Sequence, residues 1–180
     1  MLIAFSGSMG TGKTSAANYL AKTHGYKKIS FATKLREIAE FIMPGITLAL
    51  ADPRKKNKPY FSNGESARDF VINLGKLIRY HDPEYFIKAA NLENAGWPDI
   101  VVDDCRFQNE AEHIKNLGGR IIRVNRYPKL NIYGPEKLND PSETELDDYP
   151  GFDFIVHDCV NVSLNDLYKQ VNNALDEFES

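Results

Sequence analysis

The sequence of 180 residues lacks the marks of several protein classes. No apolar run approaches the ~20 residues that are needed to cross a bilayer. Only two cysteines are present, Cys105 and Cys159, so a disulfide scaffold is excluded and we expect reduced thiols in a cytoplasmic protein. The four histidines lie far apart and show no zinc-ligand spacing. A membrane-spanning protein, a disulfide-rich secreted domain and a zinc protein are therefore not expected.

The sequence also lacks an excess of charge of either sign. The 22 basic and 25 acidic residues give a net charge of −3, whereas a dedicated nucleic-acid binder is usually basic on at least one face. We therefore expect no nucleic-acid partner and no membrane partner. Apolar residues at 42% and charged residues at 26% are typical of a globular protein. The length is sufficient for one domain, residues 1–180, with a substantial core and an inserted lid.

The most informative stretch is residues 7–14, which read GSMGTGKT and fit the phosphate-binding loop pattern G-x-x-x-x-G-K-[ST]. Its glycines let the backbone turn tightly and bring several N–H groups to one point, where they can hold phosphate oxygens. A helix that starts near the last glycine adds its positive end to the same point. Lys13 can then reach the β- and γ-phosphates, and the Thr14 hydroxyl can bind Mg²⁺. The expected nucleotide-binding residues are Gly7, Ser8, Gly10, Thr11, Gly12, Lys13, Thr14 and Ser15.

The flanking sequence supports this interpretation of the loop. Residues 2–5 form a short apolar run suited to a buried parallel strand, and residues 14–22 carry apolar side chains at helical spacing. A Gly-rich turn without a ligand is the alternative, but a strand before the pattern and a helix after it favour nucleotide binding. The dinucleotide-binding pattern fits less well, because Ser15 stands where its third glycine should be.

The remainder of the chain predicts an α/β fold. Short apolar runs predict four more strands, at residues 27–31, 99–104, 120–124 and 152–156. Helical periodicity predicts helices between the strands, one of them over 83–95, while residues 46–65 are expected to be irregular. The expected helix caps are Thr33, Ser66, Asn109 and Ser163. Five strands alternating with helices predict an open parallel sheet with helices on both faces.

Two further stretches have features of an active site. Asp104 ends the predicted third strand, where a phosphate-loop enzyme places the carboxylate that orients Mg²⁺; a helix cap or a turn aspartate is the alternative. We also expect Asp104 among the substrate-binding residues. Cys105 is expected to be a packed thiol, because phosphoryl transfer needs no cysteine. Residues 126–150 contain four prolines and few large apolar side chains. They predict either a surface loop or a lid that carries Arg126 over the nucleotide, with a capping box at 142–145 that starts a short helix.

The candidate acceptor contacts are charged residues between the second and third strands. Lys34 and Arg36 fall in the first turn of a predicted helix, after a strand whose carboxyl end opens onto the same crevice as the phosphate loop. Arg68, Asp69 and Arg79 lie off the apolar stripe of the next predicted helix, and arginine is well suited to binding phosphate. Solvated surface charge, including an ion pair of Asp69, is the alternative.

These motifs together resemble the phage-type deoxynucleoside monophosphate kinases, over most of the chain. The similarity rests on the loop at 7–14, on FATKLREIA at 31–39 and on ARDFVINLG at 67–75. Its most selective part is the pairing of DCRFQNE at 104–110 with GGRIIRVNR at 118–126. The similarity ends with Ser142-Glu143 and with DFIVHD at 153–158.

The resemblance implies the fold of the P-loop nucleoside monophosphate kinases, with a lid over 126–150 and a helical acceptor-binding region over 44–95. It implies ATP as the donor, Mg²⁺, a deoxynucleoside monophosphate as the acceptor, a homodimer, and the host cytoplasm as the location if the gene is carried by a bacteriophage. By position it implies these roles: Lys13 and Thr14 at the donor phosphates, Asp104 near the metal, Arg106 and Arg126 on the transferred phosphoryl group, and Arg36 and Arg68 on the acceptor.

The expected function is transfer of the ATP γ-phosphoryl group to a deoxynucleoside 5′-monophosphate for DNA precursor synthesis, with Lys13, Arg106 and Arg126 as catalytic residues. Two alternatives remain: a kinase of another small acceptor, such as dephospho-coenzyme A, and a regulatory P-loop NTPase. The chain lacks the guanine-reading Asn-Lys-x-Asp motif, and a regulatory switch would not need acceptor-side arginines.

Overall fold

The structure, a computed structural model, describes residues 1–52, 54–126, 140–158 and 163–180. The chain divides into two compact units, which are described separately: residues 1–30 with 93–180, and residues 31–92. Among the described residues, no helix is both long enough and apolar enough to cross a membrane.

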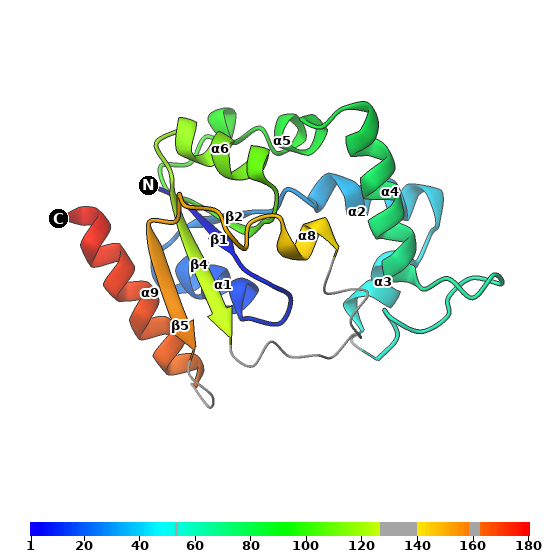
Figure 1. Ribbon diagram of the computed structural model, residues 1–180, viewed down its shortest axis with the longest axis horizontal. Helices are drawn as coiled ribbons and strands as arrows, with labels where there is room; N and C mark the ends of the chain where they lie inside the picture. Colours follow the sequence, from blue (N-terminus) through cyan, green and yellow to red (C-terminus); the bar gives the residue numbers. More distant parts are fainter. Residues whose placement is uncertain (53, 127–139, 159–162) are drawn as a thin grey trace. The chain divides into compact units, whose positions relative to one another are not determined.

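The first unit contains a five-stranded parallel sheet (Figure 1). In the order of the sheet its strands are β2 (Lys27–Ile29), β3 (Ile100–Cys105), β1 (Leu2–Ser6), β4 (Arg120–Arg126) and β5 (Phe154–Asp158). All four neighbouring pairs are parallel. The predicted five-stranded α/β fold is therefore confirmed. Because β1 lies in the centre, the loop that follows it is flanked by the carboxyl ends of β3 and β4.

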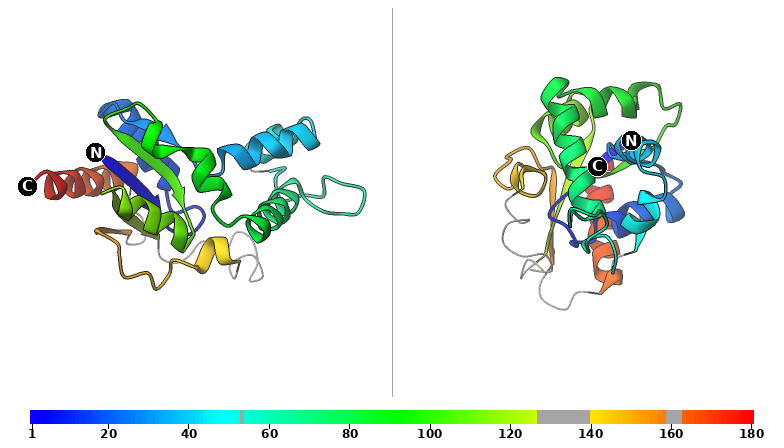
Figure 2. Two further views of the ribbon diagram at one scale, coloured as in Figure 1. Left: turned by 90° about the horizontal axis from the view of Figure 1, so that it is seen from above. Right: turned by 90° about the vertical axis from the view of Figure 1, so that its right-hand side faces the viewer.

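Helices cover both faces of this sheet (Figure 2). Helices α1 (Lys13–Thr23) and α9 (Leu164–Glu179) lie on one face, and α6 (Gln108–Asn116) lies on the other. The alternation along β1 shows the same arrangement, since Ile3 and Phe5 pack into the core formed with α1 and α9 while Ala4 is buried on the opposite face. Two shorter elements are η1 (Leu92–Asn94) and α8 (Pro141–Thr144).

The second unit is helical. It consists of α2 (Thr33–Ile42), α3 (Ile46–Ala51), α4 (Ala67–His81) and α5 (Tyr85–Ala90). Its small core is built on Ala39, Ile46, Ala49 and Ala67, against which larger side chains such as Phe70 and Leu74 pack. Ser66 begins α4 as predicted, because its hydroxyl accepts a hydrogen bond from Asp69 N at 3.1 Å.

Helix α3 contradicts the prediction that residues 46–65 are irregular. The carboxylate of Glu40, which belongs to α2, accepts hydrogen bonds from Gly45 N and Thr47 N at 2.7 and 3.0 Å. It therefore satisfies amides at the start of α3 in place of a local cap, while Ile46 is fully buried. A cap supplied from the preceding helix leaves no signal within the helix itself.

Several predicted helix boundaries are also wrong. The helix expected over 83–95 ends at Ala90, because Asn91 takes a left-handed conformation with φ of 47°. Thr33 and Asn109 lie inside their helices, with Ala32 and Phe107 at the cap positions. The capping box expected at 142–145 is also misplaced: the cap is Asp140, two residues earlier, whose carboxylate accepts from Ser142 N at 3.0 Å. Ser163 caps α9 as predicted.

Candidate functional site

The loop at 7–14 connects β1 to α1 in a conformation that requires glycine. Gly7, Gly10 and Gly12 have φ of 140°, 81° and 106°, which side-chain-bearing residues rarely adopt. At Gly7 a Cβ atom would also lie 2.3 Å from the carbonyl oxygen of Val124 on β4. The loop is therefore packed tightly against the neighbouring strand, and its backbone turns as a phosphate-binding loop must.

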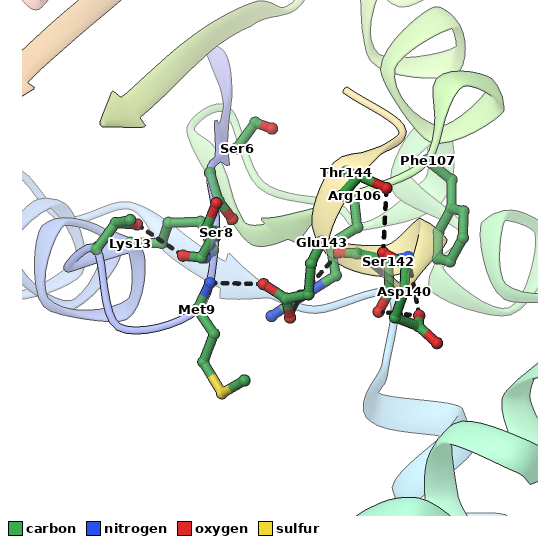
Figure 3. Close-up of polar contacts among 12 residues, drawn as sticks. Ser6, Ser8, Met9, Lys13, Arg106, Phe107, Asp140, Ser142, Glu143 and Thr144 are labelled. Atoms are coloured by element: carbon green, nitrogen blue, oxygen red, sulfur yellow. Dashed lines mark hydrogen bonds and ion pairs between the residues drawn. The ribbon is translucent and has the colours of Figure 1, made fainter. Parts of the chain in front are cut away.

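Lys13 is buried within this loop and is 6% exposed. Its Nζ donates to the main-chain oxygens of Gly7 at 2.6 Å and Ser8 at 2.7 Å (Figure 3). Burial, with the nearby positive charge of Arg106 as the next contribution, lowers the pKa of Lys13 from 10.5 to about 7. A lysine held in this way is short of negative charge around it, and a phosphate group would supply that charge.

A carboxylate reaches the loop from a distant part of the chain. Glu143 of α8 is 7% exposed, and its Oε2 accepts a hydrogen bond from Met9 N at 2.6 Å (Figure 3). Its Oε1 accepts from Arg106 Nη1 at 2.6 Å. A single carboxylate thus bridges a main-chain amide of the loop and the guanidinium group of Arg106.

Arg106 follows β3, and two glutamates hold it. Besides the contact with Glu143, its Nη1 donates to Ser142 O at 2.9 Å, and its main-chain N donates to Glu110 Oε2 at 2.9 Å. Burial by itself would lower the pKa of Arg106, but the carboxylate of Glu143 more than offsets this and raises it. Arg106 is therefore a fixed positive charge near the phosphate loop.

The proposed metal residues lie at the same end of the sheet. Thr14 is exposed in the first turn of α1, and Asp104 is partly exposed near the end of β3 with Oδ2 accepting from Ser30 Oγ at 2.6 Å. Among the described residues, no three His, Cys, Asp or Glu side chains form a metal cluster. Mg²⁺ needs none, because it takes one or two protein oxygens and completes its shell with water and substrate phosphates. The residues present fit that chemistry.

The structure leaves the predictions for Arg126 and the lid untested, but it describes Cys105. Arg126 is the last residue of β4, where its backbone pairs with Asp158, and its side chain lies outside the described part of the chain. Of the predicted lid, residues 127–139 also lie outside it. Cys105 is fully buried, and burial raises the pKa of its thiol well above the usual value, which agrees with the prediction of a packed thiol.

The five candidate acceptor residues of the predicted helices all lie in the second unit. Lys34 is paired with Glu37 at 2.9 Å, and Arg36 is exposed on the same helix. Arg68 N donates to Lys56 O at 3.1 Å, and Asp69 Oδ2 accepts from Ser66 Oγ at 2.7 Å as part of the α4 cap. The guanidinium group of Arg79 lies 4.5 Å from the ring centre of Phe86. Their acceptor roles remain predictions.

Sequence reasoning missed two residues that shape the site, Glu110 and Glu143. Glu110 is 2% exposed and holds the backbone at Arg106 and Phe107 with one oxygen, at 2.9 and 3.2 Å. Both glutamates lie in the stretches that carry the family resemblance, and this position was the only feature of the sequence that could have identified them as site residues. A buried contact between residues 134 positions apart, as between Met9 and Glu143, has no local pattern.

Comparison with known proteins finds relatives that match most of the chain. No family model matches the chain. It is 27% identical over 197 aligned residues to a protein of Acanthamoeba polyphaga mimivirus named "Putative deoxynucleotide monophosphate kinase", across 98% of this chain and 96% of that protein. It is also 26% identical over 167 residues to "Uncharacterized protein ORF76" of Ictalurid herpesvirus 1 (strain Auburn), across 89% of this chain and 59% of that protein.

Solved structures match the whole fold. A dephospho-CoA kinase from Campylobacter jejuni superposes with a TM-score of 0.53 at 13% identity, covering 98% of this chain and 96% of that one. A shikimate kinase from Acinetobacter baumannii, solved with shikimate, gives 0.51 at 14% identity, covering 99% and 94%. The chain has the fold of a P-loop kinase. The resemblance of the chain to the deoxynucleoside monophosphate kinases is confirmed by the mimivirus relative. Both relatives are viral but neither is a phage protein, so a phage origin remains a prediction.

Proposed function

We propose that the chain transfers the γ-phosphoryl group of ATP to the phosphate of a deoxynucleoside 5′-monophosphate. The observation that carries this proposal is the meeting of three features at one end of the sheet. The loop after β1 has three glycines with positive φ, the buried Lys13 belongs to that loop, and the guanidinium group of Arg106 is joined to the loop through Glu143. The printed name of the mimivirus relative supports this choice of acceptor.

In this proposal the residues bind and position charge, and no covalent intermediate is needed. The amides of residues 7–14 and Lys13 hold the β- and γ-phosphates, and Arg106 and Arg126 contact the transferred group. Thr14 and Asp104 would hold Mg²⁺, which neutralises charge on the β- and γ-oxygens when bound. The acceptor phosphate is already an anion, so alignment and charge neutralisation supply most of the rate enhancement.

The acceptor contacts are part of the same proposal. Lys34, Arg36, Arg68, Asp69 and Arg79 come from the helical second unit and would bind the deoxynucleotide. Of these, Arg36 has the simplest role, since it is exposed at the end of the first turn of α2, whereas Arg79 already packs on the ring of Phe86. The homodimer stays a prediction, which sedimentation of the purified protein would test.

The deciding experiment is an acceptor panel. Purified protein is mixed with Mg-ATP and each of the deoxynucleoside and ribonucleoside monophosphates, dephospho-coenzyme A and shikimate, and ADP formation is followed. We expect ADP formation to depend on a deoxynucleoside monophosphate. Stimulation by dephospho-coenzyme A alone would assign the chain to another acceptor class, and hydrolysis that no acceptor changes would indicate a regulatory NTPase.

A further inference from the structure

Glu143 has no role in the proposed reaction, yet its carboxylate lies at the phosphate loop (Figure 3). Its two oxygens accept from Met9 N and from Arg106 Nη1, each at 2.6 Å. Glutamate is rarely buried unless it is paired, and this side chain is 7% exposed. These two contacts are short and involve charge, so they are strong enough to hold α8 against the loop.

The two donors that Glu143 occupies are of the kinds that hold phosphate in this type of enzyme. One is a main-chain amide within the loop, and the other is an arginine beside it. A carboxylate offers them negatively charged oxygens, as a phosphoryl group would. In the same structure Lys13 turns its ammonium group inward to Gly7 O and Ser8 O. Met9 N and Arg106 therefore have a carboxylate partner from within the chain, whereas the hydrogen bonds of Lys13 Nζ go to neutral main-chain oxygens.

We propose that Glu143 is a displaceable substitute for phosphate, whose carboxylate occupies Met9 N and Arg106 until the phosphates of ATP take its place. This inference rests on the proposed function, since it assumes that a nucleotide binds the loop. A carboxylate and a phosphate repel each other at one small site, so the two occupy it in turn. Departure of Glu143 releases Arg106 for the transferred phosphoryl group and detaches residues 140–146 from the loop.

Competition of this kind has a measurable effect on affinity. If the loop is competent to bind only when Glu143 has left, the apparent dissociation constant rises by the inverse of the competent fraction. The hydrogen bonds of the charged Glu143 carboxylate favour the closed state, and bonds of this kind lower the competent fraction about tenfold. Glu143→Gln keeps the size of the side chain and removes its charge, so we expect it to bind ATP about tenfold more tightly than the wild type.

Glu145→Gln is the matched control. Glu145 lies two residues further along the same segment, is exposed, and accepts from Gln108 N at 2.8 Å without touching the loop. It makes the same chemical change two residues away in the same segment. We therefore expect Glu145→Gln to bind ATP with the affinity of the wild type.

The test is titration calorimetry with ATP for the wild type and the two variants, without acceptor. Tighter binding by Glu143→Gln alone supports the inference. Equal or weaker binding by Glu143→Gln, while the wild type binds, overturns it and leaves the proposed function standing. Absence of ATP binding in all three proteins overturns both.

Hydrogen exchange on the wild type gives a second measurement that does not depend on a variant folding. Adding Mg-ATP should protect amides at 7–14 and at the same time speed exchange at 140–146, because the phosphate has displaced the carboxylate that held α8. Protection of both segments together would overturn the inference, since Glu143 would then remain in place beside the nucleotide.

Discussion

Replacing Lys13 with methionine should change how the stability of the nucleotide-free protein depends on pH. The pKa of Lys13 is lowered from 10.5 to about 7 by burial and then by Arg106. Each tenfold change in proton affinity is worth about 1.4 kcal/mol, so charging Lys13 costs up to ~5 kcal/mol more in the folded protein than in the unfolded chain. Lys13→Met removes that cost together with the two hydrogen bonds to Gly7 O and Ser8 O.

The sign of the pH dependence follows from proton counting. Between pH 7 and 10.5 the unfolded chain keeps a proton on Lys13 that the folded protein has lost, so the stability of the wild type rises with pH across this window. Below pH 7 the full penalty is present, and above 10.5 it has disappeared. Relative to Lys13→Met, the free energy of unfolding of the wild type should rise by about 1.4 kcal/mol per pH unit between 7.5 and 9.5.

Urea unfolding followed by circular dichroism at several pH values measures this difference. Lys22→Met, at the exposed far end of α1, is the control and should follow the wild-type profile. Parallel profiles for the wild type and Lys13→Met would refute the reasoning, because Lys13 would then not be short of negative charge in the free protein. Lys13→Met should also lose phosphoryl transfer altogether while it remains folded.

Three other substitutions test separate parts of the structure. Gly7→Ala should lower the free energy of unfolding in urea by several kcal/mol, because its Cβ would lie 2.3 Å from Val124 O. The control Gly118→Ala has open space around its Cβ and should lower the free energy of unfolding by about 1 kcal/mol, because of its φ of 74°. Equal losses in the two variants would contradict the close packing at Gly7. Arg106→Lys should lower kcat in steady-state assays by roughly 10²–10³-fold, because lysine cannot replace the planar, bidentate guanidinium group. An unchanged kcat would show that Arg106 has no role in the reaction. Burial raises the pKa of Asp153, but hydrogen bonds from two cations and a main-chain amide outweigh this and lower it. The wild type should therefore lose more stability than Asp153→Asn as the pH falls below about 4; identical acid unfolding would count against the ion cluster.

The elements that could be predicted from the sequence are those whose signal is local. The strand before the phosphate loop, the loop itself and the helix after it are encoded in the consecutive residues from Leu2 to Thr23. The five parallel strands followed from short apolar runs, and the caps at Ser66 and Ser163 followed from hydroxyls placed three residues before an aspartate. In each case the pattern that identifies the element lies within a few consecutive residues, although the strands pair with partners far along the chain.

The elements that could not be predicted depend on distant side chains. Helix α3 needs the carboxylate of Glu40 on the preceding helix, and Asp140 rather than Ser142 begins α8. The contact of Glu143 with Met9 joins residues 134 positions apart. A glutamate on a short helix looks like surface charge until the fold places it against the loop, so its burial and its pairing with Arg106 could be found only in the structure.

The central claim is that the loop and Arg106 direct a phosphoryl group from ATP to a deoxynucleotide. The most direct measurement uses ATP labelled at the γ-phosphate, a deoxynucleoside monophosphate and Mg²⁺, with the products separated by chromatography. We predict that the label appears in the deoxynucleoside diphosphate for the wild type and that Lys13→Met forms no labelled diphosphate. Label found only in inorganic phosphate, whatever deoxynucleotide is supplied, would contradict the claim.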